Sequence, residues 1–323
     1  MMLMVKISAP GKLMLFGEHA VVHGNPCIVT AVNHRMSAEL SKRRDQKIIL
    51  LAPDVGIDIY EIDIAELGKG HPKGVRFAIT AVKNFFEKYG LQSGLDIKTK
   101  SEFSSEFGFG SSSAVTVCVL KGLSELFGIK VSNRELFDLA YKTVLEIQGV
   151  GSGFDVAAAI WGGTLWFITG GKEIEPLKTG PIPLVVGYTG VKADTATLIR
   201  MVEERMKKEP EIINDIFDKM SELVRAALAD IEAGEWSAVG SKMDSAQGLL
   251  AKLGVSSKEL DRLIAAARSA GALGAKLSGA GGGDCMIALA KPGKEDAVKA
   301  AITAAGGKLI LLKTGAAGVR LEG

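Results

Sequence analysis

The sequence contains few residues of several chemically informative kinds. Among its 323 residues there are only three cysteines and four histidines. The cysteines, Cys27, Cys118 and Cys285, lie far apart. An odd number of cysteines without close spacing excludes a disulfide framework and the usual ligand spacing of a zinc site. We therefore expect buried thiols in a reducing environment.

Excess charge and long apolar runs are also missing. The formal net charge is only +2, which excludes the broad basic surface typical of proteins that bind nucleic acid. The most apolar stretch, residues 154–171, contains Asp155 and four glycines, so it does not predict a membrane span. Pro10 and Gly11 interrupt the apolar N-terminal segment before a signal-peptide core is complete. We expect a cytoplasmic protein that binds neither nucleic acid nor membranes.

Glycine, in contrast, is abundant, with 39 residues, many of them clustered. Clustered glycine indicates backbone in left-handed conformations, or backbone that approaches a ligand closely. Chain length and a change of pattern near residue 180 predict two domains, residues 1–180 and 181–323. Helical periodicity ending at glycine predicts helices over residues 75–90, 112–128, 132–149 and 211–234. A capping box at Ser256 and Glu259 predicts a further helix start, and residues 308–313 and 318–323 are expected to pair as the last two strands.

A run of glycine and serine stands immediately before one predicted helix. Residues 106–115, EFGFGSSSAV, place Gly108, Gly110 and three serines at this helix start. A helix N-terminus offers free N–H groups and a positive dipole end, and glycines let the backbone wrap an anion. The alternative is an ordinary glycine-rich turn with serine caps. The run matches neither the P-loop nor the dinucleotide-binding pattern.

Three further segments carry candidate functional residues. Residues 278–285, SGAGGGDC, hold four glycines in five positions, which favours a loop that closes on a ligand over a simple tight turn. Lys12 follows an expected Pro-Gly turn, with Glu18 and His19 at the end of the apolar segment that follows. Asp155 precedes an apolar helix, where it is either an N-cap or a carboxylate that orients or deprotonates a hydroxyl group.

The order of these segments is more specific than any one of them. APGKLMLFGEHAVVHG, GFGSSSA, SGFD and GAGGG follow one another as they do in the GHMP kinase superfamily, and the resemblance spans nearly the whole chain. Residues 17–32, 187–195 and 247–283 look most like archaeal mevalonate kinases. The resemblance implies two α+β domains with the active site in the cleft between them. It also implies transfer of the γ-phosphoryl group of ATP to the 5-hydroxyl of mevalonate with Mg²⁺, and a homodimer.

The same resemblance assigns roles to individual positions. It implies that Asp155 and Lys12 are catalytic, that Ser112 holds Mg²⁺, and that Glu18, His19 and Thr189 lie near the substrate. It also implies that the nucleotide is bound by Gly108, Gly110, Ser111, Ser112, Ser113, Gly279, Ala280, Gly281 and Gly282.

Several positions depart from the mevalonate kinase pattern. Val144 stands where many of these enzymes carry a metal-binding glutamate, while Glu146 points elsewhere on a regular helix. Asp284 replaces a further glycine, and with the SGFD segment it favours phosphomevalonate kinase as the alternative. Glu102 and Glu106 would repel phosphate unless they face away. A kinase for a phosphorylated acceptor needs extra cations, for which the candidates are Lys73, Arg76 and Lys192. Another GHMP kinase activity, or a catalytically inactive sensor, are further alternatives.

Overall fold

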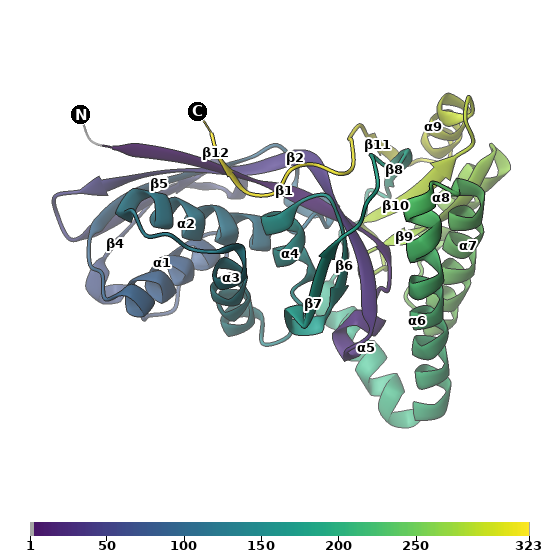
Figure 1. Ribbon diagram of the computed structural model, residues 1–323, viewed down its shortest axis with the longest axis horizontal. Coiled ribbons are helices and arrows are strands. Elements are labelled where there is room, and N and C mark those ends of the chain that lie inside the picture. The colour runs from purple at the N-terminus through teal and green to yellow at the C-terminus, as the bar shows by residue number, and fades with distance from the viewer. Residues whose placement is uncertain (1–2, 323) are drawn as a thin grey trace.

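The computed structural model describes residues 3–322, which form two sheets with their helices (Figure 1). The larger sheet has eight strands, with a main path in the order β12-β1-β2-β5-β3-β4 and with β6 joining β2 to β7. All of its strand pairs are antiparallel except β3 with β5. Its strands are β1 (Met4–Phe16), β2 (Pro26–Arg43), β3 (Lys47–Ala52), β4 (Ile57–Asp63), β5 (Gly94–Ser101), β6 (Thr164–Ile168), β7 (Glu173–Pro176) and β12 (Arg320–Leu321).

Four helices lie together on one side of this sheet (Figure 1). They are α1 (Arg76–Tyr89), α2 (Ser111–Phe127), α3 (Asn133–Gln148) and α4 (Phe154–Trp161). Large buried side chains such as Phe85, Phe137 and Phe167 fill the space between the helices and the strands. Ser132 and Glu135 form a capping box at the start of α3. Short 3-10 turns occur at η1 (Ala20–His23), η2 (Pro53–Val55), η3 (Ile64–Glu66), η4 (Ser105–Phe107) and η5 (Thr169–Gly171).

The second sheet is antiparallel, with the strand order β11-β8-β10-β9. Its strands are β8 (Leu184–Tyr188), β9 (Ala272–Ser278), β10 (Cys285–Ala290) and β11 (Lys308–Ile310). The helices of this half are α5 (Thr195–Lys208), α6 (Pro210–Ala233), α7 (Trp236–Leu253), α8 (Lys258–Ser269) and α9 (Glu295–Ala304). A separate apolar core includes Phe217 and Met286. We propose that the division between the two domains lies near residue 180, between β7 and β8.

Several local predictions were wrong. Residues 308–313 and 318–323 do not pair with each other, because β11 pairs with β8 and β12 pairs with β1. Pro10 and Gly11 form no turn, since β1 continues through them with a register shift against β2. The cap of α8 is Ser257, one residue after the predicted position. Helices α5 and α7 were not predicted, although α6 matches its expected range closely.

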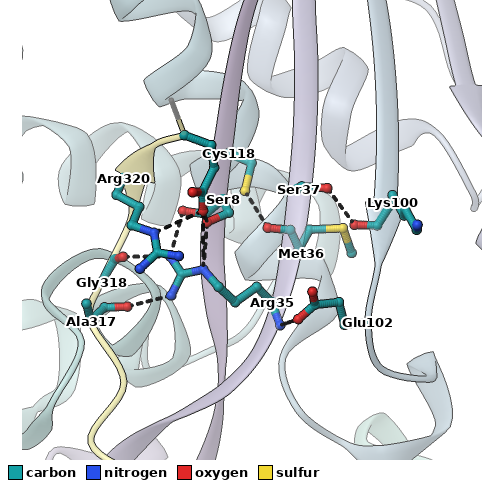
Figure 2. A network of polar contacts seen from close by, with 11 residues as sticks. Ser8, Arg35, Met36, Ser37, Lys100, Glu102, Cys118, Ala317, Gly318 and Arg320 are labelled. Carbon is teal, nitrogen blue, oxygen red and sulfur yellow. Dashed lines mark hydrogen bonds and ion pairs between the residues drawn. The ribbon is translucent and has the colours of Figure 1, made fainter.

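The last segment of the chain returns from the second sheet to the first and is held there by Arg35. Figure 2 shows the guanidinium group of Arg35 between β1 and this segment. It donates to the hydroxyl and the carbonyl of Ser8, at 2.6 and 3.0 Å, and to the carbonyls of Ala317 and Gly318, both at 2.8 Å. Gly318 also packs so tightly on the end of α4 that an added Cβ would lie 2.1 Å from the carbonyl oxygen of Ile160. The C-terminal segment thus fixes one end of α4.

Replacement of Arg35 by Met should destabilise the fold. Hydrogen bonds from a charged donor contribute about 1.5–3 kcal/mol each, so we expect the free energy of unfolding to fall by about 2–4 kcal/mol. Urea denaturation measures this change. Lys6→Met is the matched control, because Lys6 pairs with Glu39 on the same sheet but has a side chain that is 48 % exposed. Equal stability of the two variants would contradict the role given to Arg35.

Candidate active site

The glycine–serine run forms a tight loop at the start of α2, as predicted. Gly108 and Gly110 have φ angles of 71° and 78°, a left-handed conformation that only glycine adopts at low cost. Gly110 is the N-cap of α2, so Ser111 and Ser112 lie in the first helical turn, where N–H groups are free to bind an anion. We call residues 107–113 the phosphate loop.

Lys12 on β1 holds this loop from one side. Its main-chain N–H donates to the carbonyl of Phe109 at 3.1 Å, and its ammonium group donates to the carbonyl of Gly108 at 2.8 Å. The side chain is buried and its charge lies 5.1 Å from the centre of the Phe154 ring. Burial lowers the pKa of Lys12, and the carboxylates of Asp155 and Asp284 act in the opposite direction. The residue is therefore a desolvated cation next to the loop.

Asp155 lies opposite Lys12, in the first turn of α4. The N-cap of this helix is Gly153, so the N-cap interpretation of Asp155 was wrong. A carboxylate oxygen of Asp155 accepts a hydrogen bond of 2.6 Å from the hydroxyl of Ser113, which is fully buried. A Cβ added to Gly110 would lie 3.4 Å from both the Cβ of Asp155 and the Cε of Lys12. The lysine, the aspartate and the phosphate loop therefore meet at one point, with Ser113 fixing the carboxylate.

Glu18 and His19, at the start of η1, connect the two halves of the protein. Glu18 is 2 % exposed and forms an ion pair with Lys276 of β9, which is fully buried. The sequence analysis missed Lys276, although a lone lysine between apolar residues just before the glycine loop was a signal. His19 Nε2 lies 2.8 Å from the carbonyl oxygen of Ala280. Both predicted substrate residues thus contact the second domain, and their role toward a substrate stays a prediction.

The second glycine loop is shaped partly by close packing. A Cβ on Gly281 would lie 2.0 Å from the carbonyl oxygen of Val255, and one on Gly283 would lie 2.5 Å from that of Val191. Close approach of the neighbouring backbone therefore requires glycine at positions 281 and 283. Gly279, in contrast, faces open space, with a φ of 104°. Nucleotide binding by residues 279–282 remains a prediction.

Asp284 follows this loop and brings a second ion pair to the site. Its backbone has a φ of 54°, which is unusual for a residue other than glycine. Its carboxylate accepts from the main-chain N–H of Ala193 at 2.9 Å and from the ammonium group of Lys192 at 3.1 Å. Thr189 lies in the same turn, where its main-chain N–H donates to the carbonyl of Asp284 at 2.9 Å. Of the three candidate cations for a phosphorylated acceptor, Lys192 is the one whose contacts place it beside the phosphate loop.

The remaining departures from the family pattern have clear structural outcomes. Val144 is buried among apolar side chains, and Glu146 instead pairs with Lys83 at 2.8 Å, as expected from its direction on the helix. Glu102 accepts from the main-chain N–H of Arg35 at 2.9 Å and Glu106 is exposed. Within residues 3–322, no group of three or more histidine, cysteine, aspartate or glutamate side chains is arranged to hold a metal ion. No helix in the same range is long and apolar enough to cross a membrane.

Comparisons with known proteins agree with this arrangement. The family model of the GHMP kinases N terminal domain matches residues 76–163, and that of the GHMP kinases C terminal domain matches residues 227–308. The chain therefore belongs to the GHMP kinases, a class of small-molecule kinases.

Individual relatives define the position within this class. Mevalonate kinases of Thermococcus gammatolerans and Pyrococcus horikoshii are 38 % and 36 % identical to this chain, with 98 % of each sequence covered. The solved Methanococcus jannaschii mevalonate kinase superposes with a TM-score of 0.81 at 25 % identity, covering 100 % of this chain and 99 % of its own. An L. major mevalonate kinase solved in complex with R-mevalonate gives 0.78 at 25 % identity, covering 97 % and 96 %. The chain is a member of the mevalonate kinases.

The buried position of His19 predicts a pH dependence of stability. Burial lowers the pKa of His19 below its ordinary value of 6.5, although the contact with Ala280 opposes this. Below about pH 6.5 the unfolded chain binds a proton that the folded protein does not, so stability falls as the pH falls. Urea denaturation at about pH 7.5 and pH 5.5 should show a larger loss of stability for the wild type than for His19→Gln. Equal losses in both proteins would contradict this contribution.

Proposed function

We propose that this protein transfers the γ-phosphoryl group of ATP to the 5-hydroxyl group of mevalonate. The observation that carries the proposal is the position of Gly110, where an added Cβ would lie 3.4 Å from both the Cβ of Asp155 and the Cε of Lys12. Phosphoryl transfer depends on positioning and charge stabilisation rather than on a covalent intermediate. The site offers both at the start of a helix, and the full-length relatives named mevalonate kinase support mevalonate as the acceptor.

In this proposal each group has a separate role, which follows from its position in the site. The free N–H groups at the start of α2 bind the phosphates. Asp155 orients the acceptor hydroxyl and takes its proton, while Ser113 keeps the carboxylate in place through their bond of 2.6 Å. Lys12 is desolvated and lies where Asp155 meets the phosphate loop, so its charge can stabilise the transferring phosphoryl group. Glu18, His19 and Thr189 form the part of the site that faces the acceptor.

Mg²⁺ is the proposed cofactor, and the site offers it few oxygen ligands from side chains. Magnesium prefers oxygen ligands and retains water and phosphate oxygens in its shell. Ser112 offers a hydroxyl in the first turn of α2, and Asp155 lies on the neighbouring helix. Val144 offers no ligand, and Glu146 is occupied by Lys83 and Asn84. We therefore propose that Ser112, with the phosphates and water, holds the ion, which neutralises the charge of the triphosphate.

Phosphomevalonate kinase is the alternative that the sequence left open. A second phosphate on the acceptor would need additional cations in the site. Lys192 is the candidate that lies nearby, yet its charge is paired with Asp284 at 3.1 Å. This pairing favours an unphosphorylated acceptor. A cytoplasmic location, expected from the sequence, and a homodimer, implied by the family resemblance, are further proposals.

Turnover with different acceptors tests the proposal directly. ADP release from Mg·ATP is measured with mevalonate, 5-phosphomevalonate, homoserine and galactose as separate acceptors. We expect turnover with mevalonate alone. Turnover with 5-phosphomevalonate instead would overturn the proposed acceptor, and no turnover with any of them would overturn the proposed activity.

Replacement of Asp155 by Asn should keep the fold and nucleotide affinity but reduce the turnover number. If the carboxylate accepts the hydroxyl proton, the loss is about a hundredfold or more. Steady-state kinetics with a parallel calorimetric titration of Mg·ADP separates the two effects. Near-normal turnover of the variant would exclude Asp155 as the base.

Replacement of Ser112 by Ala should raise the Mg²⁺ concentration needed for half-maximal activity by several-fold, because one oxygen ligand is lost. Ser241→Ala is the control, because Ser241 lies on α7, where its hydroxyl donates to the carbonyl of Ser237. The measurement is a Mg²⁺ titration of activity at saturating ATP. Identical titration curves for the wild type and the Ser112 variant would remove Ser112 from the metal shell.

A further inference from the structure

The ion pair of Asp284 and Lys192 touches the phosphate loop from the second domain. An added Cβ on Gly108 would lie 2.6 Å from a carboxylate oxygen of Asp284, so the carboxylate lies against the loop backbone. Lys192 also lies beside the loop, since its ammonium group lies 3.4 Å from the carbonyl oxygen of Glu106, the residue just before the loop. The pair therefore borders the surface where the phosphates are proposed to bind.

The carboxylate of Asp284 is fixed in this position. Its side chain is only 6 % exposed, and the main-chain N–H of Ala193 donates to it at 2.9 Å. Its main chain is held on both sides, with its N–H bonded to the carbonyl of Val191 and its carbonyl to the N–H of Thr189. The left-handed φ of 54° shows that this placement is maintained despite backbone strain. The bonds from Ala193 and Lys192 hold the carboxylate beside the loop.

A fixed, nearly buried negative charge beside an anion site opposes binding unless a cation neutralises it. Lys192 contacts both oxygens of the carboxylate, at 3.1 and 3.2 Å. The ammonium of Lys12 donates to the carbonyl of Gly108, and although Asp155 and Asp284 both act on its pKa, no ion pair joins Lys12 to Asp284 within residues 3–322. Lys192 is therefore the cation in direct contact with Asp284 among the described residues.

We propose that Lys192 is a positioning residue that neutralises Asp284, and that this makes the phosphate loop able to bind the nucleotide. The proposal rests on the proposed function, because it assumes that the loop binds the phosphates of ATP. Lys192 acts through Asp284 and not by direct contact with the phosphates. Loss of Lys192 alone leaves an unpaired carboxylate at the loop, whereas loss of both charges removes the cause of repulsion.

A double-mutant cycle tests this difference. Dissociation constants of Mg·adenylyl-imidodiphosphate are measured by calorimetry for the wild type, Lys192→Met, Asp284→Asn and the double variant. We expect Lys192→Met to bind about tenfold more weakly or worse, and the other two variants to stay within about threefold of the wild type. Lys192→Arg should retain binding, since it keeps the charge. Lys83→Met is the matched control, because Lys83 forms an ion pair with Glu146 at 2.8 Å away from the loop.

Two results would overturn the proposal. Unchanged affinity in Lys192→Met would show that the carboxylate does not oppose binding. A double variant as weak as Lys192→Met would show that Lys192 contacts the nucleotide itself. If Lys192→Met fails to fold, as judged by circular dichroism, Lys192→Gln, which also lacks the charge but keeps a polar side chain, takes its place in the cycle. Failure of the wild type to bind the analogue would instead contradict the proposed function.

Discussion

The attachment of the phosphate loop to Lys12 is the contact on which the geometry of the site depends. Lys12 binds two successive carbonyls of the loop, that of Phe109 through its main chain and that of Gly108 through its ammonium group. The bond to Phe109 fixes the loop against β1. The bond to Gly108 gives the buried ammonium group a hydrogen-bond acceptor. Removal of the lysine would leave a desolvated carbonyl, and a shift of the loop would leave a desolvated charge. Loop and lysine therefore hold each other in place.

The same region joins the two domains. The hydroxyl of Ser278 on β9 bonds both the N–H and the carbonyl of Met14 on β1, at 3.0 and 2.9 Å. The buried pair of Glu18 and Lys276 and the contact of His19 with Ala280 lie in the adjacent segments. Burial lowers the pKa of Lys276, and Glu18 opposes this shift, so the charge of Lys276 depends on its partner. Such a pair contributes little net stability but selects one relative position of its two segments.

The parts of the site that were predictable are those specified by local backbone chemistry. Gly108 and Gly110 have left-handed φ angles, which glycine adopts at low cost. The residue type itself therefore indicates such positions in the sequence. The bond between Ser113 and Asp155 joins residues 42 apart, and no local pattern encodes it. Likewise, the pairing of β12 with β1 depends on the path of the whole chain. At Gly281 the sequence does not distinguish close packing from ligand binding, because both demand a missing side chain.

The charges around the phosphate loop nearly cancel, and this limits what the site can bind. Lys12 and Lys192 contribute two positive charges, and Asp155 and Asp284 contribute two negative charges. Attraction for a triphosphate must then come from the N–H groups at the start of α2 and from the metal ion that accompanies the nucleotide. An acceptor with one carboxylate adds little repulsion to such a balanced site, while a second phosphate would add nearly two further negative charges. This charge balance independently supports an unphosphorylated acceptor, in agreement with the proposed function.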